Sequence, residues 1–443
     1  MFKRKIYDSL LEWKRESEGR TALLIEGARR IGKSTVVEEF AKNEYESYIL
    51  IDFSIASKAT RELFEDISDL DYIFLQLQLQ YKTDLVDRKS LIVFDEVQKC
   101  PLARQAIKHL VKDRRYDYIE TGSLISIKKN VKDIVIPSEE RRLNMYPMDY
   151  EEFLWAIGDN TSSRLIRNCY ETGKSLGQRT NRKLLRDFRL YMLVGGMPQA
   201  VQKYVDTNNF RKVDLVKRDI LKLYEDDFVK IDSTGKASML FNAIPAQLNK
   251  NASRYHVSSV LSRSARADGL LRLIADMKDS KTVLVSYNVN DPNVGMSSSV
   301  NISKFKMFVC DTGLFATLMF KDRDFTENEI YEKLLNDKLS ANLGYMYENI
   351  VAQILTATGN ELFYHTFANA SSGHNYEIDF LVTRKNKVCP IEIKSSGYKK
   401  HVSLDRFCEK YSERILRKYL VYTKDYARDK DVFCLPVYMV PFI

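Results

Sequence analysis

Short apolar runs alternate with amphipathic stretches over residues 1–158 of the chain. An apolar run of strand length followed by a segment with helical spacing is typical of βαβ units, whose strands lie parallel and buried. The pattern predicts strands at residues 21–26, 48–53, 90–95, 116–120 and 142–146. It predicts helices beginning at residues 34–41 and near residues 102–112. We therefore expect an α/β domain with a parallel sheet.

The pattern changes in the rest of the chain. Residues 160–235 are polar with helical spacing, which predicts a helical lid. Short helices and two strands, at 282–288 and 304–310, follow in an order that is winged-helix-like. An amphipathic helix over 336–358 then precedes strands at 361–366, 376–383 and 388–395. The expected domains are residues 1–158, 159–235, 236–310 and 311–443.

Composition places the chain among globular proteins. Hydrophobic residues make up 44% and charged residues 29% of 443 residues, which excludes a disordered chain. The six cysteines are scattered without a CxxC pair, which argues against a disulfide framework or zinc site and favours a reducing, cytoplasmic setting. Neither a signal-peptide core nor an uncharged run long enough to cross a membrane occurs, so no membrane partner is expected. A net charge of +9 permits DNA as a partner without demanding it.

A phosphate-binding loop follows the first predicted strand. Residues 27–34 read GARRIGKS, the pattern GxxxxGK[ST], and lie between a strand and a helix as that motif requires. Backbone amides of such a loop curl around phosphate, and the helix N-terminus adds positive potential. Lys33 is expected to reach the β- and γ-phosphates, and the Ser34 hydroxyl to hold Mg²⁺. The predicted ATP-binding residues here are Gly27, Ala28, Arg29, Arg30, Ile31, Gly32, Lys33, Ser34 and Thr35.

The third predicted strand ends in two acids. Asp95 closes the apolar run and Glu96 follows it, about 60 residues after the loop, as a Walker B strand does. Asp95 is expected to hold Mg²⁺ and Glu96 to polarise the attacking water. An apolar strand ending in acids is common by itself, but after a phosphate-binding loop it is the expected partner. The absence of a guanine-reading Asn-Lys-x-Asp motif favours ATP.

Four further residues are candidates for the same site. Thr121 or Ser123, at the tip of the fourth strand, could orient water; a plain turn is the alternative. Arg141 just before the fifth strand and Arg142 at its start could reach a neighbouring copy's γ-phosphate in a homo-oligomer, although solvated surface arginines are the commoner case.

The middle of the chain adds a turn and a basic region. Gly196-Met197-Pro198 resembles the GxP turn of signalling ATPases, in which the proline (Pro198 here) lies against the base; by itself it is only a helix stop and start. Basic residues then follow that phosphates would attract, or that are ordinary surface charges: Arg254, Arg263, Arg266, Arg272, Lys278 and Lys281.

Carboxylates and a lysine recur in the C-terminal third. Glu392 and Lys394 share one strand face because side chains alternate, and Asp379 lies on the preceding strand. With Glu348 from the long helix they could form a Mg²⁺-dependent phosphodiesterase site. The order helix-Glu, Asp, ExK looks like the PD-(D/E)xK pattern, without the proline before Asp379. A surface hairpin with alternating charges, and the same fold used only for binding, are the alternatives.

Several motifs together resemble one family, the prokaryotic AAA-like ATPases with a C-terminal domain of unknown function. The matching segments are 27–34, 91–98, 121–123, 146–153, 195–198, 311–314 and 377–394. The resemblance implies an α/β, AAA-like P-loop NTPase with helical lid, a winged-helix-like connector and a restriction-endonuclease-like α/β end. It supplies no physiological role.

Three functions compete at this stage. The first is an ATP-regulated, DNA-processing enzyme with Mg²⁺ as its metal. The second is a nucleotide-switched signalling or DNA-binding regulator whose nuclease-like domain does not cleave. The third is a scaffold that has lost hydrolysis, against which the intact Asp95-Glu96 pair argues.

Overall fold

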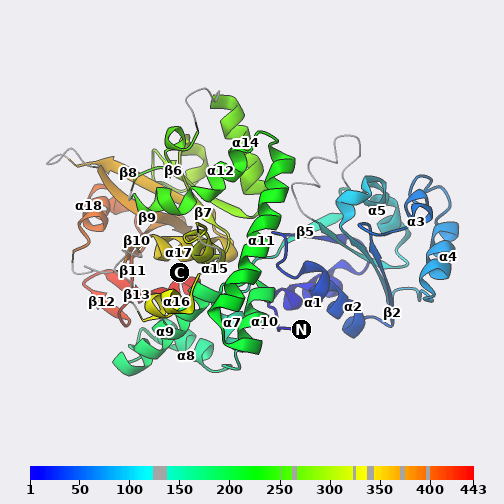
Figure 1. Ribbon diagram of the computed structural model, residues 1–443, viewed down its shortest axis with the longest axis horizontal. Coiled ribbons are helices and arrows are strands. Elements are labelled where there is room, and N and C mark those ends of the chain that lie inside the picture. The colour runs from blue at the N-terminus through cyan, green and yellow to red at the C-terminus, as the bar shows by residue number, and fades with distance from the viewer. Residues whose placement is uncertain are drawn as a thin grey trace. The chain divides into compact units, whose positions relative to one another are not determined.

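A computed structural model shows the arrangement of the chain (Figure 1). It describes residues 1–122, 137–250, 252–261, 267–322, 326–336, 344–369, 375–395 and 400–443. The chain forms two compact units, one of Met1–Tyr146 with Asp279–Lys281 and one of Pro147–Lys278 with Thr282–Ile443.

The first unit is built on a five-stranded parallel sheet. Its strands are β1 (Ala22–Glu26), β2 (Ser47–Asp52), β3 (Ser90–Asp95), β4 (Asp117–Gly122) and β5 (Glu140–Asn144). They lie in the order β2-β3-β4-β1-β5, and every neighbouring pair is parallel. The carboxyl ends of β1, β3 and β4 therefore meet at one edge, where ligands bind in open α/β sheets.

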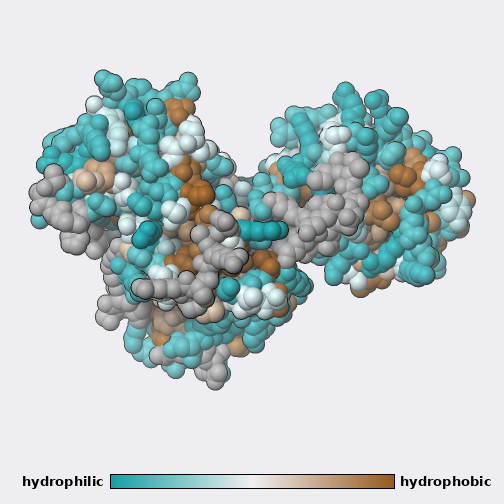
Figure 2. Space-filling view, turned by 90° about the horizontal axis from the view of Figure 1, so that it is seen from above, coloured by the Kyte–Doolittle hydropathy of each residue, from teal (hydrophilic) through white to brown (hydrophobic). Residues whose placement is uncertain are grey.

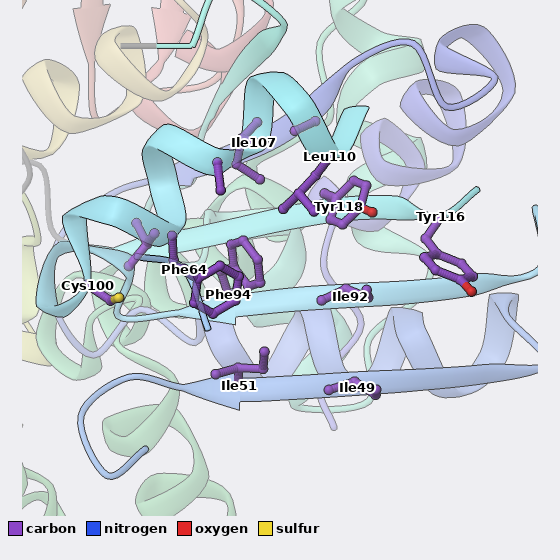
Figure 3. Packing of buried hydrophobic residues seen from close by; sticks show 14 of the residues in the cluster. Ile49, Ile51, Phe64, Ile92, Phe94, Cys100, Ile107, Leu110, Tyr116 and Tyr118 are labelled. Carbon is purple, nitrogen blue, oxygen red and sulfur yellow. The ribbon is translucent and has the colours of Figure 1, made fainter. Parts of the chain in front are cut away.

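Helices connect these strands. They are α1 (Ile6–Ser17), α2 (Lys33–Glu44), α3 (Lys58–Glu62), α4 (Leu70–Tyr81) and α5 (Pro101–Asp113), with a 3₁₀ turn η1 (Val97–Lys99). Both β1 and β3 are buried along their whole length, as strands covered on both faces must be. Figure 3 shows α5 packing its apolar side chains, such as Ile107 and Leu110, onto Ile92, Phe94 and Tyr118 of the sheet.

The second unit begins with five helices in succession. They are α7 (Tyr150–Ala156), α8 (Ser162–Thr172), α9 (Gln178–Val194), α10 (Pro198–Thr207) and α11 (Phe210–Ile231). Next come α12 (Lys236–Asn242), α13 (Ile244–Asn249), η2 (Val257–Ser259) and α14 (Ala267–Asp279). Among the later strands, the described residues form four more helices and three 3₁₀ turns: α15 (Thr312–Leu318), α16 (Asn328–Leu335), α17 (Gly344–Ala357), α18 (Val402–Lys410), η3 (Met296–Ser299), η4 (Ser412–Arg414) and η5 (Val437–Phe442).

An eight-stranded mixed sheet forms the centre of the second unit. Its strands are β6 (Val283–Val289), β7 (Val300–Val309), β8 (Phe363–Ala368), β9 (Asn375–Arg384), β10 (Lys387–Lys394), β11 (Lys418–Tyr422), β12 (Ala427–Asp429) and β13 (Val432–Pro436). Their order is β12-β13-β11-β10-β9-β8-β6-β7. The strands β8, β9 and β10 form an antiparallel meander, and β11 then pairs parallel with β10.

The division into units differs from the four expected domains. The strands expected to belong to a winged-helix-like domain over 236–310 are β6 and β7, and β6 pairs with β8 of the C-terminal part. The strand hydrogen bonds therefore run across the expected boundary at 310/311, and the sheet does not divide there. Strand pairing between distant segments leaves no mark in local sequence spacing.

The two earlier boundaries also differ. The helix α7, expected to close the first domain at residue 158, lies in the second unit, where Tyr150 packs edge-on against Phe188 of α9. The expected lid over 159–235 packs on the C-terminal part of the same unit; Lys217 of α11, for example, donates to the carbonyl of Gly313. The helices of the expected lid thus pack within the second unit.

None of the helices in the described residues is long and apolar enough to cross a membrane. The face of the molecule in Figure 2 is mainly hydrophilic, with hydrophobic side chains gathered in small groups.

Candidate nucleotide-binding site

The loop between β1 and α2 has a shape that its residues require. A Cβ atom on Gly27 would lie 2.4 Å from the carbonyl oxygen of Met145, so only glycine fits this close approach. Gly32, with φ of 92°, adopts the left-handed conformation that glycine favours and begins α2 at Lys33. The helix N-terminus, with its free backbone amides, therefore faces the loop, as an anion-binding site needs.

Lys33 is held against this loop. Its Nζ donates to the carbonyl oxygens of Gly27 (3.0 Å) and Ala28 (2.9 Å), and the side chain is buried. Burial lowers the pKa of Lys33 to about 8, although the negative charges of Glu96 and Asp95 act to raise it. A phosphate group would offer this amine a charged partner in place of two neutral carbonyls.

Asp95 joins three elements at the carboxyl edge of the sheet. It ends β3 and is buried, and its Oδ1 accepts a hydrogen bond from Ser34 Oγ at 2.8 Å. The Thr121 hydroxyl, at the end of the adjacent β4, donates to the same oxygen. The structure thus brings together Ser34, Asp95 and Thr121, which lie far apart in the sequence. Ser123 lies outside the described residues.

Glu96 adopts a left-handed backbone with φ of 53°, which is uncommon for a residue with a side chain and tends to mark functional positions. The turn ends β3 and starts η1 immediately. The buried Gln98 then donates from Nε2 to Glu96 Oε2 at 2.5 Å. The sequence analysis did not assign Gln98 to the site; its position two residues after the acid pair was the available signal.

Of the other described candidates for this site, Arg30, Thr35 and Arg141 do not hydrogen-bond to Asp95 or Glu96. Thr35 and Arg30 are exposed on the first turn of α2 and in the loop. Arg141, on the edge strand β5, forms an ion pair of 2.8 Å with Glu16, and both side chains are about half exposed. Pro198 opens α10 in the second unit. The roles of Arg141 and Pro198 remain predictions.

The C-terminal acids surround a lysine that the sequence analysis missed. Lys306 of β7 is buried, and its Nζ lies 2.5 Å from Glu377 Oε1 and 3.4 Å from Glu348 Oε2. Burial alone would lower the pKa of Lys306, but the charges of Glu348, Glu377 and Asp379 raise it above its ordinary value. Nothing in the local sequence indicates this partner, because β7 precedes the acids by 40 residues or more.

Asp379 lies where β9 and β10 separate. A β-bulge interrupts the pairing of β9 with β8 at this point, and the regular β9–β10 register ends at Phe380 and Ile391. The Oδ2 of Asp379 accepts the backbone N–H of Ile393 at 2.7 Å, in place of a strand carbonyl. Burial, and then the charge of Glu348, raises the pKa of Asp379 well above its usual range.

Glu392 faces α18. It shares one face of β10 with Lys394 and with Val388, which packs in the cluster of Leu404 and Phe407 from α18. Glu392 is buried; its Oε2 accepts the N–H of Leu404 at 3.0 Å, and its Oε1 lies 2.8 Å from Lys394 Nζ.

Each carboxylate of the predicted nuclease set therefore has a protein partner. Glu348 contacts Lys306, Asp379 contacts the N–H of Ile393, and Glu392 contacts Lys394. Within the parts of the chain that the structure describes, no group of three or more His, Cys, Asp or Glu side chains is arranged to hold a metal ion. The nucleotide site differs, because the phosphates of a nucleotide would supply most of the Mg²⁺ ligands.

A known protein family matches most of the first unit. Residues 19–154 match a family described as an AAA domain. Two families described as domains of unknown function, DUF8612 and DUF4143, match residues 185–324 and 343–440. No curated protein matches the sequence. With its five-stranded parallel sheet, the first unit is an AAA-like P-loop ATPase domain.

Several solved structures resemble the chain distantly. The Walker-type ATPase PABY2304 of Pyrococcus abyssi is 16% identical, with a TM-score of 0.41, over 72% of this chain and 96% of that one. The Holliday junction branch migration motor RuvB of Thermotoga maritima is 12% identical, with a TM-score of 0.28, over 62% of this chain and 87% of that one. The ORC1 protein of Aeropyrum pernix, solved with DNA, is 10% identical, with a TM-score of 0.28, over 76% and 93%.

Proposed function

We propose that this chain binds ATP with Mg²⁺ at the loop of residues 27–35 and hydrolyses it. The observation that carries the proposal is the Asp95 carboxylate, which the Ser34 and Thr121 hydroxyls both contact at the carboxyl edge of the parallel sheet. A loop that only joined a strand to a helix would have no need for an acid from β3, a hydroxyl from β4 and a buried lysine at one point.

Each residue has a distinct task in this proposal. Ser34 and Asp95 would hold Mg²⁺, which neutralises charge on the phosphates when bound. Lys33 would exchange the loop carbonyls for phosphate oxygens. Glu96, held by Gln98, would accept a proton from the attacking water, and Thr121 would help to position that water. Arg141 is the proposed finger toward a neighbouring copy, and Pro198 the proposed contact with the base.

Calorimetry with ATP and Mg²⁺ tests the binding step. The wild type should bind, and Lys33→Ala should lose most of the affinity because the phosphates lose their charged partner. Lys42→Ala is the matched control, since Lys42 lies on the same helix but is exposed and paired with Glu38. Equal binding by Lys33→Ala and the wild type would contradict the proposed site.

For the C-terminal part we propose a restriction-endonuclease-like module that acts on or binds DNA and is coupled to the ATPase. The meander β8-β9-β10 followed by α18 and a parallel β11 supports it, with Glu348, Asp379, Glu392 and Lys394 as its candidate residues. The setting we propose is cytoplasmic.

A second candidate is a nucleotide-switched regulator whose module binds DNA without cutting it. The ion pairs of Lys306 with Glu348 and Glu377 favour this candidate, because a lysine ammonium already neutralises acids that a metal would need. Incubation of supercoiled plasmid with protein, ATP and Mg²⁺ or Mn²⁺ separates the two. Nicking that disappears in Lys394→Ala supports an active nuclease, whereas DNA binding without nicking supports the regulator.

A further inference from the structure

Positive charge is concentrated in one short part of the second unit. Residues 160–190 contain eight Lys or Arg and two acids, a net +6 out of +9 for the whole chain. This segment covers α8, the following loop and most of α9. The excess is not spread evenly over the surface, as it would be if it served solubility alone.

One face of α9 carries four of these charges. Arg179, Arg182, Lys183 and Arg186 are all exposed. At 3.6 residues per turn they fall on one side of the helix. Leu184, Leu185 and Phe188 lie on the other side and are buried. We call these four residues the α9 basic face.

The charges of this face are largely unneutralised. Lys183 contacts Asp187 (2.9 Å) and Asp159 (3.4 Å). Among the described residues, Arg179, Arg182 and Arg186 make no ion pair. Like charges three or four positions apart on a helix repel each other, so the arrangement is unfavourable unless an anion compensates it.

The helix that displays these arginines is firmly anchored within its unit. Asp425 accepts the backbone N–H groups of Leu176 (3.0 Å) and Gly177 (2.7 Å), just before α9 starts. Tyr438 donates to the buried Asn181 at 2.6 Å, and Gln353 donates to Tyr191 near the helix end. Three contacts along its length therefore fix α9, which lies at the margin of the unit in Figure 1. A fixed helix loses little entropy when its side chains bind a partner.

We propose that the α9 basic face binds the phosphate backbone of double-stranded DNA. The arginines are spaced about 4.5 and 6 Å along the helix axis, at a rise of about 1.5 Å per residue. Such a row suits a dense line of phosphates, which arginine contacts with two hydrogen bonds at once. A membrane surface fits less well, since this face shows no large apolar side chain to insert. The proposal rests on the proposed DNA-related function for its choice of polyanion.

Fluorescence anisotropy with the full-length protein and a labelled duplex of mixed sequence tests this proposal over a range of salt concentrations. The test variant is Arg179→Glu/Arg182→Glu/Arg186→Glu. The matched control is Lys222→Glu/Lys236→Glu/Lys250→Glu, which makes the same change in charge at exposed positions elsewhere in the second unit. ATP hydrolysis by each variant reports whether the protein is folded.

The test variant should bind duplex at least about tenfold more weakly than the control variant. The slope of log affinity against log salt concentration should become shallower by about 2 to 3, because each lost phosphate contact removes about 0.9 from it. The proposal is overturned if both variants weaken equally, if the test variant binds like the wild type, or if the wild type ignores DNA but binds anionic vesicles through this face. Absence of ATP hydrolysis in the wild type would instead sink the proposed ATPase while leaving the DNA result intact.

Discussion

At the scale of single residues, we expect two positions in this protein to tolerate almost no substitution. Gly27 approaches the Met145 carbonyl too closely for a side chain, and Lys306 is enclosed by acids. The motif predicts the first of these from sequence. The second depends on strand β7 reaching a helix and a strand that follow much later, so no local pattern could reveal it.

Gly27→Ala should abolish ATP binding. The new methyl group would lie 2.4 Å from a backbone oxygen, so the loop must move away from the position that holds phosphate. Gly269→Ala is the control, since nothing lies within 4 Å of its added Cβ and alanine favours a helix. Calorimetry with ATP and Mg²⁺ distinguishes them. Normal ATP affinity in Gly27→Ala would show that the loop does not depend on this contact.

Lys306→Met should lower the free energy of unfolding by about 3–5 kcal/mol, because removal of one partner leaves buried acids uncompensated. Adding Glu377→Gln should recover part of that loss. Chemical denaturation of the single and double variants at pH 7 measures the coupling. If the two effects simply add, Lys306 and Glu377 do not form the ion pair described above.

At the scale of helices and strands, the sequence predicts elements of both units. The predicted strand 90–95 agrees with β3 residue for residue, and the predicted strand 376–383 lies within β9. Local signals such as an apolar run, a glycine or a helix cap suffice there. The pairing of β6 with β8 has no such signal, since it joins segments more than 70 residues apart.

Two glycines, Gly195 at the end of α9 and Gly313 in the first turn of α15, let these helices approach closely. A Cβ on Gly313 would lie 2.5 Å from the Cα of Gly195, and Asp311 beside it accepts the backbone N–H of Gly196 at 2.6 Å. Gly313→Ala should therefore destabilise the second unit by roughly 2 kcal/mol or more, since backbone must shift. Thermal unfolding should show this loss while the calorimetric affinity for ATP is retained. An unchanged melting temperature would contradict the close packing.

The buried Lys217 links α11 to the same turn by donating to the carbonyls of Leu193 (2.7 Å) and Gly313 (3.1 Å). Burial lowers its pKa to about 8, although the negative charges of Asp214 and Asp311 act to raise it. In the unfolded chain a lysine titrates near 10.4, so between about pH 8 and 10 the unfolded state binds more protons. The contribution of Lys217 to stability should therefore rise with pH in this window, by up to about 1.4 kcal/mol per unit.

Urea unfolding of the wild type and Lys217→Met at pH 7.5, 8.5 and 9.5 measures this contribution. The unfolding free energy of the wild type minus that of Lys217→Met should increase as pH rises. A constant difference would mean that the Lys217 amine titrates normally.

At the scale of the whole molecule, the protein combines an AAA-like P-loop ATPase domain with a unit built on a mixed sheet. The candidate nucleotide site was predictable because its motifs are short and continuous. The contacts of the C-terminal acids were not predictable, because their partners lie on β7, β10 and α18, which are far apart in the sequence. The proposed coupling needs ATP to be hydrolysed and not merely held.

Phosphate release at saturating ATP and Mg²⁺ is the most direct test of that claim. The wild type should turn over ATP, and Glu96→Gln should bind ATP with similar affinity yet hydrolyse it at least about a hundredfold more slowly, because the group that accepts the proton from water is lost. A wild type that releases no phosphate, or a Glu96→Gln variant that is as active as the wild type, would contradict the account.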